Sequence, residues 1–142
     1  DQNSYSKEMS NPIDQLSPRF SIAYAMNDKL SLNFNIGKYF QLPAYTVMGF
    51  KDMNGELVNR ENNLKYINNK HIVGGIEFNP EKYSKITVES FYKKYENYPF
   101  LLRDSISLAN LGGDFGVIGN EAVSSNSSGR SYGLEFLAQR KY

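Results

Sequence analysis

The pair of residues with the most recognisable catalytic spacing is Ser90 and Lys93, which spell the Ser-x-x-Lys of penicillin-binding enzymes. That chemistry needs a helical turn to bring the hydroxyl and the amine together. Residues three apart on a strand point to opposite faces, and the segment around this pair alternates as a strand does. The sequence also has no Lys-Thr-Gly partner motif. The spacing therefore predicts no nucleophilic site.

Two further stretches resemble nucleotide-binding signatures. Asp114-Phe115-Gly116 spells the magnesium-binding motif of protein kinases, but no His-Arg-Asp or Val-Ala-Ile-Lys segment accompanies it. The glycine-rich stretch 112–119 could suggest phosphate binding, yet no Gly-Lys-Ser/Thr follows it. A flexible or tightly turned loop is the better interpretation of both.

The titratable side chains also lack a catalytic arrangement. His71 is the only histidine, and its place at the outer end of a predicted strand favours a surface or rim role over a general base. Glu77, Glu89 and Glu135 could form a metal or glycosidase set. They recur at similar places in three predicted strands, however, which is typical of wall residues that face a hydrated lumen. We expect no enzyme, no metal site and no cofactor.

An aromatic cluster followed by a charged pair is the best candidate for ligand contact. The candidates are Tyr98, Phe100, Arg103 and Asp104. They would lie in an external loop, where rings and charges could contact a sugar, a peptide or a siderophore. The preceding Tyr92 and Tyr95 are expected in an aromatic girdle at a membrane interface.

Composition narrows the class of protein. The 142 residues carry a net charge of +1 with cations scattered among acids, which argues against a nucleic-acid partner. The absence of Cys excludes disulfides, thiol nucleophiles and Cys-ligated zinc. Eleven Tyr and nine Phe without any Trp favour strands and membrane interfaces. No apolar run is long enough for a membrane helix, and the N-terminus does not resemble a signal peptide.

These residues lie on a chain that alternates apolar and polar side chains. The predicted strands cover residues 19–26, 30–40, 71–79, 85–95 and 130–141. Turns of a few residues follow the first and third strands, whereas polar loops of about thirty residues follow the second and fourth. We predict an all-β fold: an antiparallel up-and-down meander, part of a transmembrane β-barrel with short periplasmic turns and long extracellular loops.

The predicted strands assign side chains to two environments. Tyr132, Leu134 and Phe136 would face lipid, and the three glutamates Glu77, Glu89 and Glu135 would face the lumen. The long loops are expected to be either functional or disordered, and the run 124–129 to be a mobile linker. A soluble all-β binding module, for example one that binds carbohydrate in its long loops, remains the alternative.

Several segments resemble the barrel strands of TonB-dependent outer-membrane receptors, especially the Bacteroidetes-type versions. In the first half these are Leu16-Ser-Pro-Arg-Phe-Ser-Ile-Ala-Tyr, Asn27-Asp-Lys-Leu-Ser-Leu-Asn and Gly37-Lys-Tyr-Phe-Gln-Leu-Pro43. In the second half they are Tyr66-Ile-Asn-Asn-Lys-His-Ile-Val-Gly-Gly-Ile-Glu-Phe, Ile86-Thr-Val-Glu-Ser-Phe-Tyr-Lys-Lys-Tyr-Glu-Asn-Tyr-Pro-Phe100 and Gly129-Arg-Ser-Tyr-Gly-Leu-Glu-Phe. The order and spacing of the segments carry the resemblance from Leu16 to Tyr142.

The resemblance implies an outer-membrane protein of a Gram-negative bacterium that takes up a siderophore, a glycan or a peptide. Such receptors have a plug domain and a barrel of about 22 strands. This chain offers five predicted strands and no plug, so we expect one part of a longer or split receptor. The implied partners are outer-membrane lipid, the rest of the barrel and plug, the TonB complex and a surface lipoprotein.

Overall fold

A computed structural model describes residues 4–111 and 120–141 of the chain. The long strands are β1 (Arg19–Ala25), β2 (Leu30–Gln41), β3 (Ile67–Phe78), β4 (Ser84–Leu101) and β6 (Val123–Arg140), with a short β5 (Ile106–Ser107). The helices are single turns: η1 (Lys7–Met9), η2 (Pro12–Gln15), α1 (Tyr45–Met48), α2 (Val58–Glu61) and η3 (Leu108–Asn110). Among the described helices, none has the length and apolar character needed to cross a membrane.

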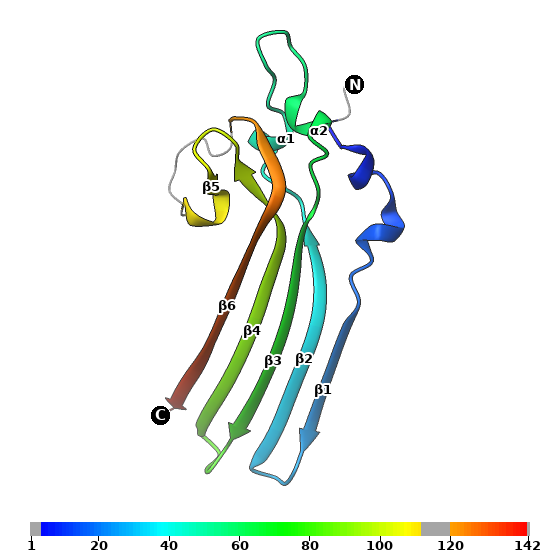
Figure 1. Cartoon of the computed structure of the whole chain (residues 1–142). Helices are drawn as coiled ribbons and strands as arrows, with labels where there is room; N and C mark the ends of the chain where they lie inside the picture. Colours follow the sequence, from blue (N-terminus) through cyan, green and yellow to red (C-terminus); the bar gives the residue numbers. More distant parts are fainter. Residues whose placement is uncertain (1–3, 112–119, 142) are drawn as a thin grey trace. The chain divides into compact units, whose positions relative to one another are not determined.

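The strands form an antiparallel meander, as predicted. Their order is β1-β2-β3-β4, and both β5 and β6 pair with β4. Figure 1 shows successive long strands running in opposite directions. The connections after β1 and β3 are short turns, whereas those after β2 and β4 are long. Among the described strands the sheet is open, because β1 and β6 each pair with one neighbour.

The chain divides into two compact units, which we describe separately. The strand unit contains Ser17–Lys38, Lys70–Lys94 and Arg130–Tyr142. The loop unit contains Asp1–Leu16, Tyr39–Asn69 and Tyr95–Gly129.

Pairing between β1 and β2 determines which side chains of the strand unit share a face. Phe20 pairs with Ile36, Ile22 with Phe34, and Tyr24 with Leu32. Partners in an antiparallel ladder point to the same side, so these apolar side chains share one face, the even face. The odd-numbered partners form the other face, the odd face, and are mostly small or polar. There, Asn35 Nδ2 donates a hydrogen bond of 2.6 Å to Ser21 Oγ.

The two faces continue through the other strands of this unit. On the odd face, the ammonium of Lys85 contacts the carboxylate of Glu77, and a Cβ at Gly133 would meet the ring of Phe91. On the even face the apolar side chains stay exposed, including Leu134, which is 73% exposed. The exposed set of this face comprises Phe20, Ile22, Tyr24, Leu32, Phe34, Ile36, Ile72, Ile76, Phe78, Tyr92, Tyr132, Leu134 and Phe136. A contiguous apolar surface of this kind marks an interaction site rather than ordinary solvent-exposed surface.

Three strands extend further than the alternation predicted. β3 begins at Ile67 rather than at 71, β4 ends at Leu101 rather than at 95, and β6 begins at Val123 rather than at 130. The polar run 124–129 is therefore strand, and the linker prediction was wrong. Its Ser and Asn side chains gave no alternation, but backbone pairing with β4 needs none.

The long connections are ordered where the structure describes them, and they bury a core of their own. Val47, Met48, Leu64 and Val123 are at most 2% exposed. They pack with Met9, Leu101 and Leu108, and with the partly buried Leu42, Tyr66 and Tyr98. Because these residues come from distant parts of the chain, no local sequence pattern predicts that they form one core.

Candidate functional site

Asn59 in α2 joins the two long connections at the centre of the loop unit. Its side-chain Nδ2 donates to the carbonyl oxygens of Val47 (2.7 Å) and Glu121 (2.9 Å), and its Oδ1 accepts from the Val123 N–H (2.7 Å). The side chain is fully buried, where an unpaired amide would be costly. Both donors and the acceptor are satisfied, so one residue connects segments that lie more than sixty positions apart.

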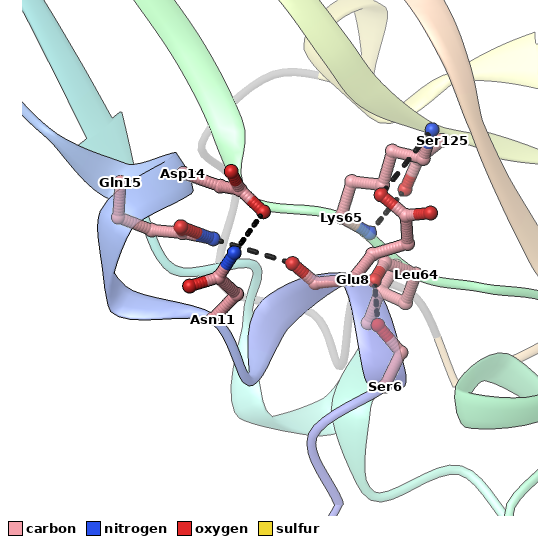
Figure 2. Close-up of polar contacts among 8 residues, drawn as sticks. All are labelled: Ser6, Glu8, Asn11, Asp14, Gln15, Leu64, Lys65 and Ser125. Carbon is pink, nitrogen blue, oxygen red and sulfur yellow. Dashed lines mark hydrogen bonds and ion pairs between the residues drawn. The ribbon is translucent and has the colours of Figure 1, made fainter.

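The N-terminal segment is held against the same unit by polar contacts. Figure 2 shows the hydroxyl of Ser6 donating to the carbonyl oxygen of Leu64, and the Lys65 N–H donating to Ser125 Oγ at 2.9 Å. Lys65 Nζ also lies 4.0 Å from the Glu8 carboxylate, in an exposed position where an ion pair contributes little. Within residues 4–16, the Ser6 bond to the Leu64 backbone and the buried side chain of Met9 therefore attach the N-terminal segment to the loop unit.

The four residues predicted to contact ligand do not lie in one loop. Tyr98 and Phe100 belong to β4, which corrects their predicted place in a loop, while their contact with a ligand stays a prediction. The strand continues past 95 because β5 pairs with it, placing Phe100 opposite Ser107. Tyr98 packs against the buried core, and its ring meets that of Tyr95 edge to face with centroids 6.4 Å apart. Its role in the structure is packing.

Arg103 and Asp104 follow β4 in a turn and remain exposed, as predicted. Arg103 Nε lies 4.0 Å from the Asp104 carboxylate, and the two side chains are 81% and 50% exposed. Ser105 completes the turn in the left-handed region, with φ at 54°. These two charged groups are available to a ligand that approaches the loop unit.

A polar depression of about 450 Å³ also lies on the loop unit, and the sequence did not reveal it. Its lining residues are Lys7, Gly55, Glu56, Leu57, Arg60, Glu61 and Asn63. Lys7 and Arg60 provide cations, and Glu56 and Glu61 provide carboxylates. The two cations are about fifty positions apart in the chain, so only the folded loop unit brings them to one place. Such a mixed lining suits a polar ligand with many hydrogen-bonding groups.

One edge of this depression is built by a turn around Asp52. The Asp52 carboxylate accepts from the N–H groups of Asn54 and Glu56, both at 2.9 Å. The hydrogen bond from the Glu56 N–H is the main cause that lowers the pKa of Asp52 below its usual value; partial burial, the next largest effect, opposes it, and hydrogen bonds from Asn54 and Gly55 lower the pKa further. Gly55 takes φ of 85°, a conformation that a side chain would strain. The Asp-Met-Asn-Gly sequence is the signal that could have predicted this turn.

The three strand glutamates all lie on the odd face but do not meet at one point. Glu77 is paired with Lys85 and accepts a bond of 3.1 Å from Asn79 Nδ2. Glu89 and Glu135 border a separate depression of about 530 Å³, together with Thr87, Phe136 and Leu137. Among the described residues, no group of three His, Asp or Glu is placed to hold a metal.

His71 lies within β3 rather than at its outer end, which corrects the sequence prediction. Its Nε2 is 2.8 Å from Asn35 Oδ1, and Asn35 in turn donates to Ser21. This chain of side-chain hydrogen bonds crosses β1, β2 and β3 on the odd face. It orients the imidazole as a structural partner of the sheet.

Comparison with known families decides what these two units are part of. A family model for the TonB-dependent receptor-like β-barrel matches residues 1–142. The chain belongs to the TonB-dependent receptor β-barrel family. Its members are outer-membrane receptors and transporters of Gram-negative bacteria rather than enzymes, and they work with a plug domain and TonB. The family resemblance of the strand segments is confirmed. Searches of curated proteins and of solved structures gave no match.

Membership in the TonB-dependent receptor β-barrel family is consistent with the contrast between the apolar even face and the polar odd face. Strands of an outer-membrane barrel alternate between lipid and lumen, and their long loops lie outside the cell. The glutamates and His71 share the odd face, and Leu134 with its aromatic neighbours shares the even face. The long connections of this chain, with the polar depression and the exposed Arg103 and Asp104, belong to the loop unit.

Proposed function

We propose that this chain is a segment of a TonB-dependent receptor that takes up a scarce nutrient across the outer membrane. The even face contacts lipid, with Tyr132, Leu134 and Phe136 in the hydrocarbon region. The odd face, with Glu77, Glu89 and Glu135, lines the hydrated interior. β1 and β6 pair with further strands of the barrel. The observation that carries this assignment is that the exposed large apolar side chains of the long strands lie on the even face, with Leu137 of β6 as the exception on the odd face.

The loop unit supplies the ligand-contacting surface in this proposal. Its depression carries both cations and carboxylates, and Arg103 and Asp104 add exposed charge elsewhere in the same unit. These groups favour a ligand rich in hydroxyls, amides or carboxylates, which includes glycans, peptides and siderophores. The receptor makes no covalent change to its cargo. It binds the nutrient in the outer loops and admits it when TonB acts on the plug, and a surface lipoprotein that closes over the loops is a further proposed partner.

A soluble binding module would need another element to cover the even face. Leu134 is 73% and Tyr132 is 71% exposed, and neither belongs to the buried core. A soluble sandwich buries such a face against a second sheet. The lipid environment therefore explains the described surface better.

The proposal is tested first by locating the parent protein and then by probing the two faces. Peptides from this sequence should identify a much longer protein in purified outer membranes. Because the chain has no native Cys, Leu134→Cys and Glu135→Cys in that parent each give one spin-labelling site in this segment. We expect the label at 134 to be reached by oxygen dissolved in lipid, and the label at 135 by a water-soluble nickel complex. A parent in the soluble fraction, or equal access at both positions, would overturn the assignment.

A further inference from the structure

We propose that Asn54 is a site of spontaneous deamidation, and that the side chain of Asp52 restrains the reaction by keeping the turn around Asn54 closed. The turn lies in the connection between α1 and α2 of the loop unit (Figure 1). The inference goes beyond the proposed function, because it concerns a covalent change of the protein itself. It requires neither a ligand nor a particular orientation in the membrane.

The sequence places a glycine directly after Asn54, and Asn54-Gly55 is the only Asn-Gly pair in the chain. In deamidation, the backbone nitrogen of the following residue loses its proton to water and attacks Cγ of the asparagine. A bond forms between this nitrogen and Cγ, the bond between Cγ and Nδ2 breaks, and ammonia leaves. Water then opens the cyclic imide at either carbonyl, which gives aspartate or isoaspartate. Glycine favours the attack because it has no Cβ that hinders its nitrogen.

The folded protein leaves this pair accessible to water. Asn54 and Gly55 are both exposed. Among the described residues, no atom lies within 4 Å of the place where a Cβ at residue 55 would stand. The surroundings therefore hinder neither the attack nor the hydrolysis, and any restraint must come from the turn itself.

Asp52 engages both groups that have to react. The Gly55 N–H, which is the nucleophile once deprotonated, donates to the Asp52 carbonyl oxygen at 3.0 Å. Nδ2 of Asn54, which leaves as ammonia, donates to Asp52 Oδ2 at 3.2 Å, and the Asn54 N–H donates to Oδ1 at 2.9 Å. The bonds to the carboxylate are charge-assisted and therefore stronger than bonds between neutral groups. Both reacting groups must leave Asp52 before they can meet.

A second pair of hydrogen bonds closes the turn behind Asn54 and Gly55. The Glu56 N–H donates to Asp52 Oδ1 at 2.9 Å, and the Asp52 N–H donates to the Glu56 carbonyl oxygen at 3.1 Å. The Gly55 backbone has φ of 85° within this closed turn. Deamidation therefore has to follow a local opening, and its rate reports how often the turn opens.

The reaction would change the polar depression of the loop unit. Gly55 and Glu56 both line that depression, and Asn54 directly precedes them. Aspartate at position 54 adds a carboxylate next to Glu56. Isoaspartate also lengthens the backbone inside a turn that depends on Gly55. The modification therefore alters the charge and the shape of one edge of the depression.

The test is peptide mapping of the purified parent protein after storage in neutral buffer. Tandem mass spectrometry separates asparagine, aspartate and isoaspartate at position 54. Digestion in water enriched in a heavy oxygen isotope marks any deamidation that occurs during preparation. We expect Asp52→Ala to raise the rate at Asn54 by about tenfold, because the carboxylate bonds are lost. Asp52→Asn, which keeps a neutral acceptor and therefore the turn, should raise it by about threefold.

Two controls separate the turn from other effects on the rate. Glu56→Gln removes a carboxylate that is equally close in sequence, but the hydrogen bonds described for this turn involve only the Glu56 backbone. Its rate should equal that of the unchanged protein. In guanidinium chloride, where the turn is unfolded, all variants should react equally and faster than the folded protein. Equal folded rates with and without the Asp52 carboxylate, the same acceleration in Glu56→Gln, or an Asn54 that outlasts the other asparagines after unfolding would overturn the proposal.

Discussion

Asn59 shows how much of the loop unit depends on one polar side chain. Its buried amide makes hydrogen bonds with three backbone groups of the long connections. In a strand or helix these groups would find their partners in the backbone itself. Its three partners come from the segments around α1 and the start of β6. Loss of the side chain leaves the three groups without this partner in a dry interior, which costs more than the bonds themselves contributed.

We therefore predict that Asn59→Ala destabilises the loop unit by about 2–4 kcal/mol. Hydrogen exchange in the parent receptor should become faster at Val47, Leu64 and Val123. The matched control is Asn62→Ala, since Asn62 is exposed and its Nδ2 donates a longer hydrogen bond, of 3.3 Å, to the Val123 carbonyl. If both variants exchange alike, Asn59 does not hold the unit together.

The turn at Asp52 should respond to acid. The folded pKa of Asp52 is lowered by the Glu56, Asn54 and Gly55 N–H groups, so its contribution is present above the unfolded pKa near 3.8 and is lost as pH falls through the lower folded value. We expect the Asn54 and Glu56 amides to exchange faster below that range. In Asp52→Asn the amide oxygen still accepts but cannot titrate, so this step should disappear. A step that persists in Asp52→Asn would assign it to another group.

At the scale of elements, the odd and even faces predict that each long strand tolerates different changes at adjacent residues. The face assignment follows from pairs such as Ile22 with Phe34 and from odd-face contacts such as Lys85 with Glu77. A shift of register by one residue would exchange the two environments completely. Adjacent positions on β6 therefore provide a direct comparison.

Leu134→Arg should cost the intact barrel roughly 2–4 kcal/mol if the residue lies near the middle of the bilayer, whereas Glu135→Gln should be mild. The reason is that the charged side chain at 134 would be transferred from water into hydrocarbon, which costs free energy, while the side chain at 135 would remain hydrated. Urea unfolding of the refolded receptor in lipid vesicles measures both differences. Equal tolerance of the two changes would refute the assigned faces.

At the scale of the whole molecule, the described strands form an open sheet whose even face carries exposed apolar side chains. Leu134, Tyr132 and Phe136 are each more than two-thirds exposed. β1 and β6 leave unpaired edges that can join other strands or other copies. In the wall of a receptor barrel, neighbouring strands would pair with the edges of β1 and β6, and lipid would cover the even face.

The isolated 142-residue chain should therefore require detergent to stay in solution. Without detergent we expect aggregation, because the even face and both edges would meet water or one another. Sedimentation with and without a mild detergent measures this. A soluble, monomeric chain in plain buffer would favour the soluble binding module instead.

The sequence by itself determined the fold class, the strand unit and its two faces. Alternation in segments such as 19–26 and 30–40 is local, and local periodicity is read directly from the chain. The family resemblance rests on the same segments, and the match over residues 1–142 confirms it. The faces of Glu135 and Leu134 also follow from parity alone once strand pairing is known.

Only the tertiary structure decided the loop unit and the ends of the strands. Tyr98 packs in a core, Ser125 lies in a strand, and Asn59 joins α2 to β6 because of partners far away in the sequence. Lys38 and Lys70 line the same groove because β2 pairs with β3. Contacts between distant residues leave no periodic trace in either segment, and for that reason the local pattern could not predict them.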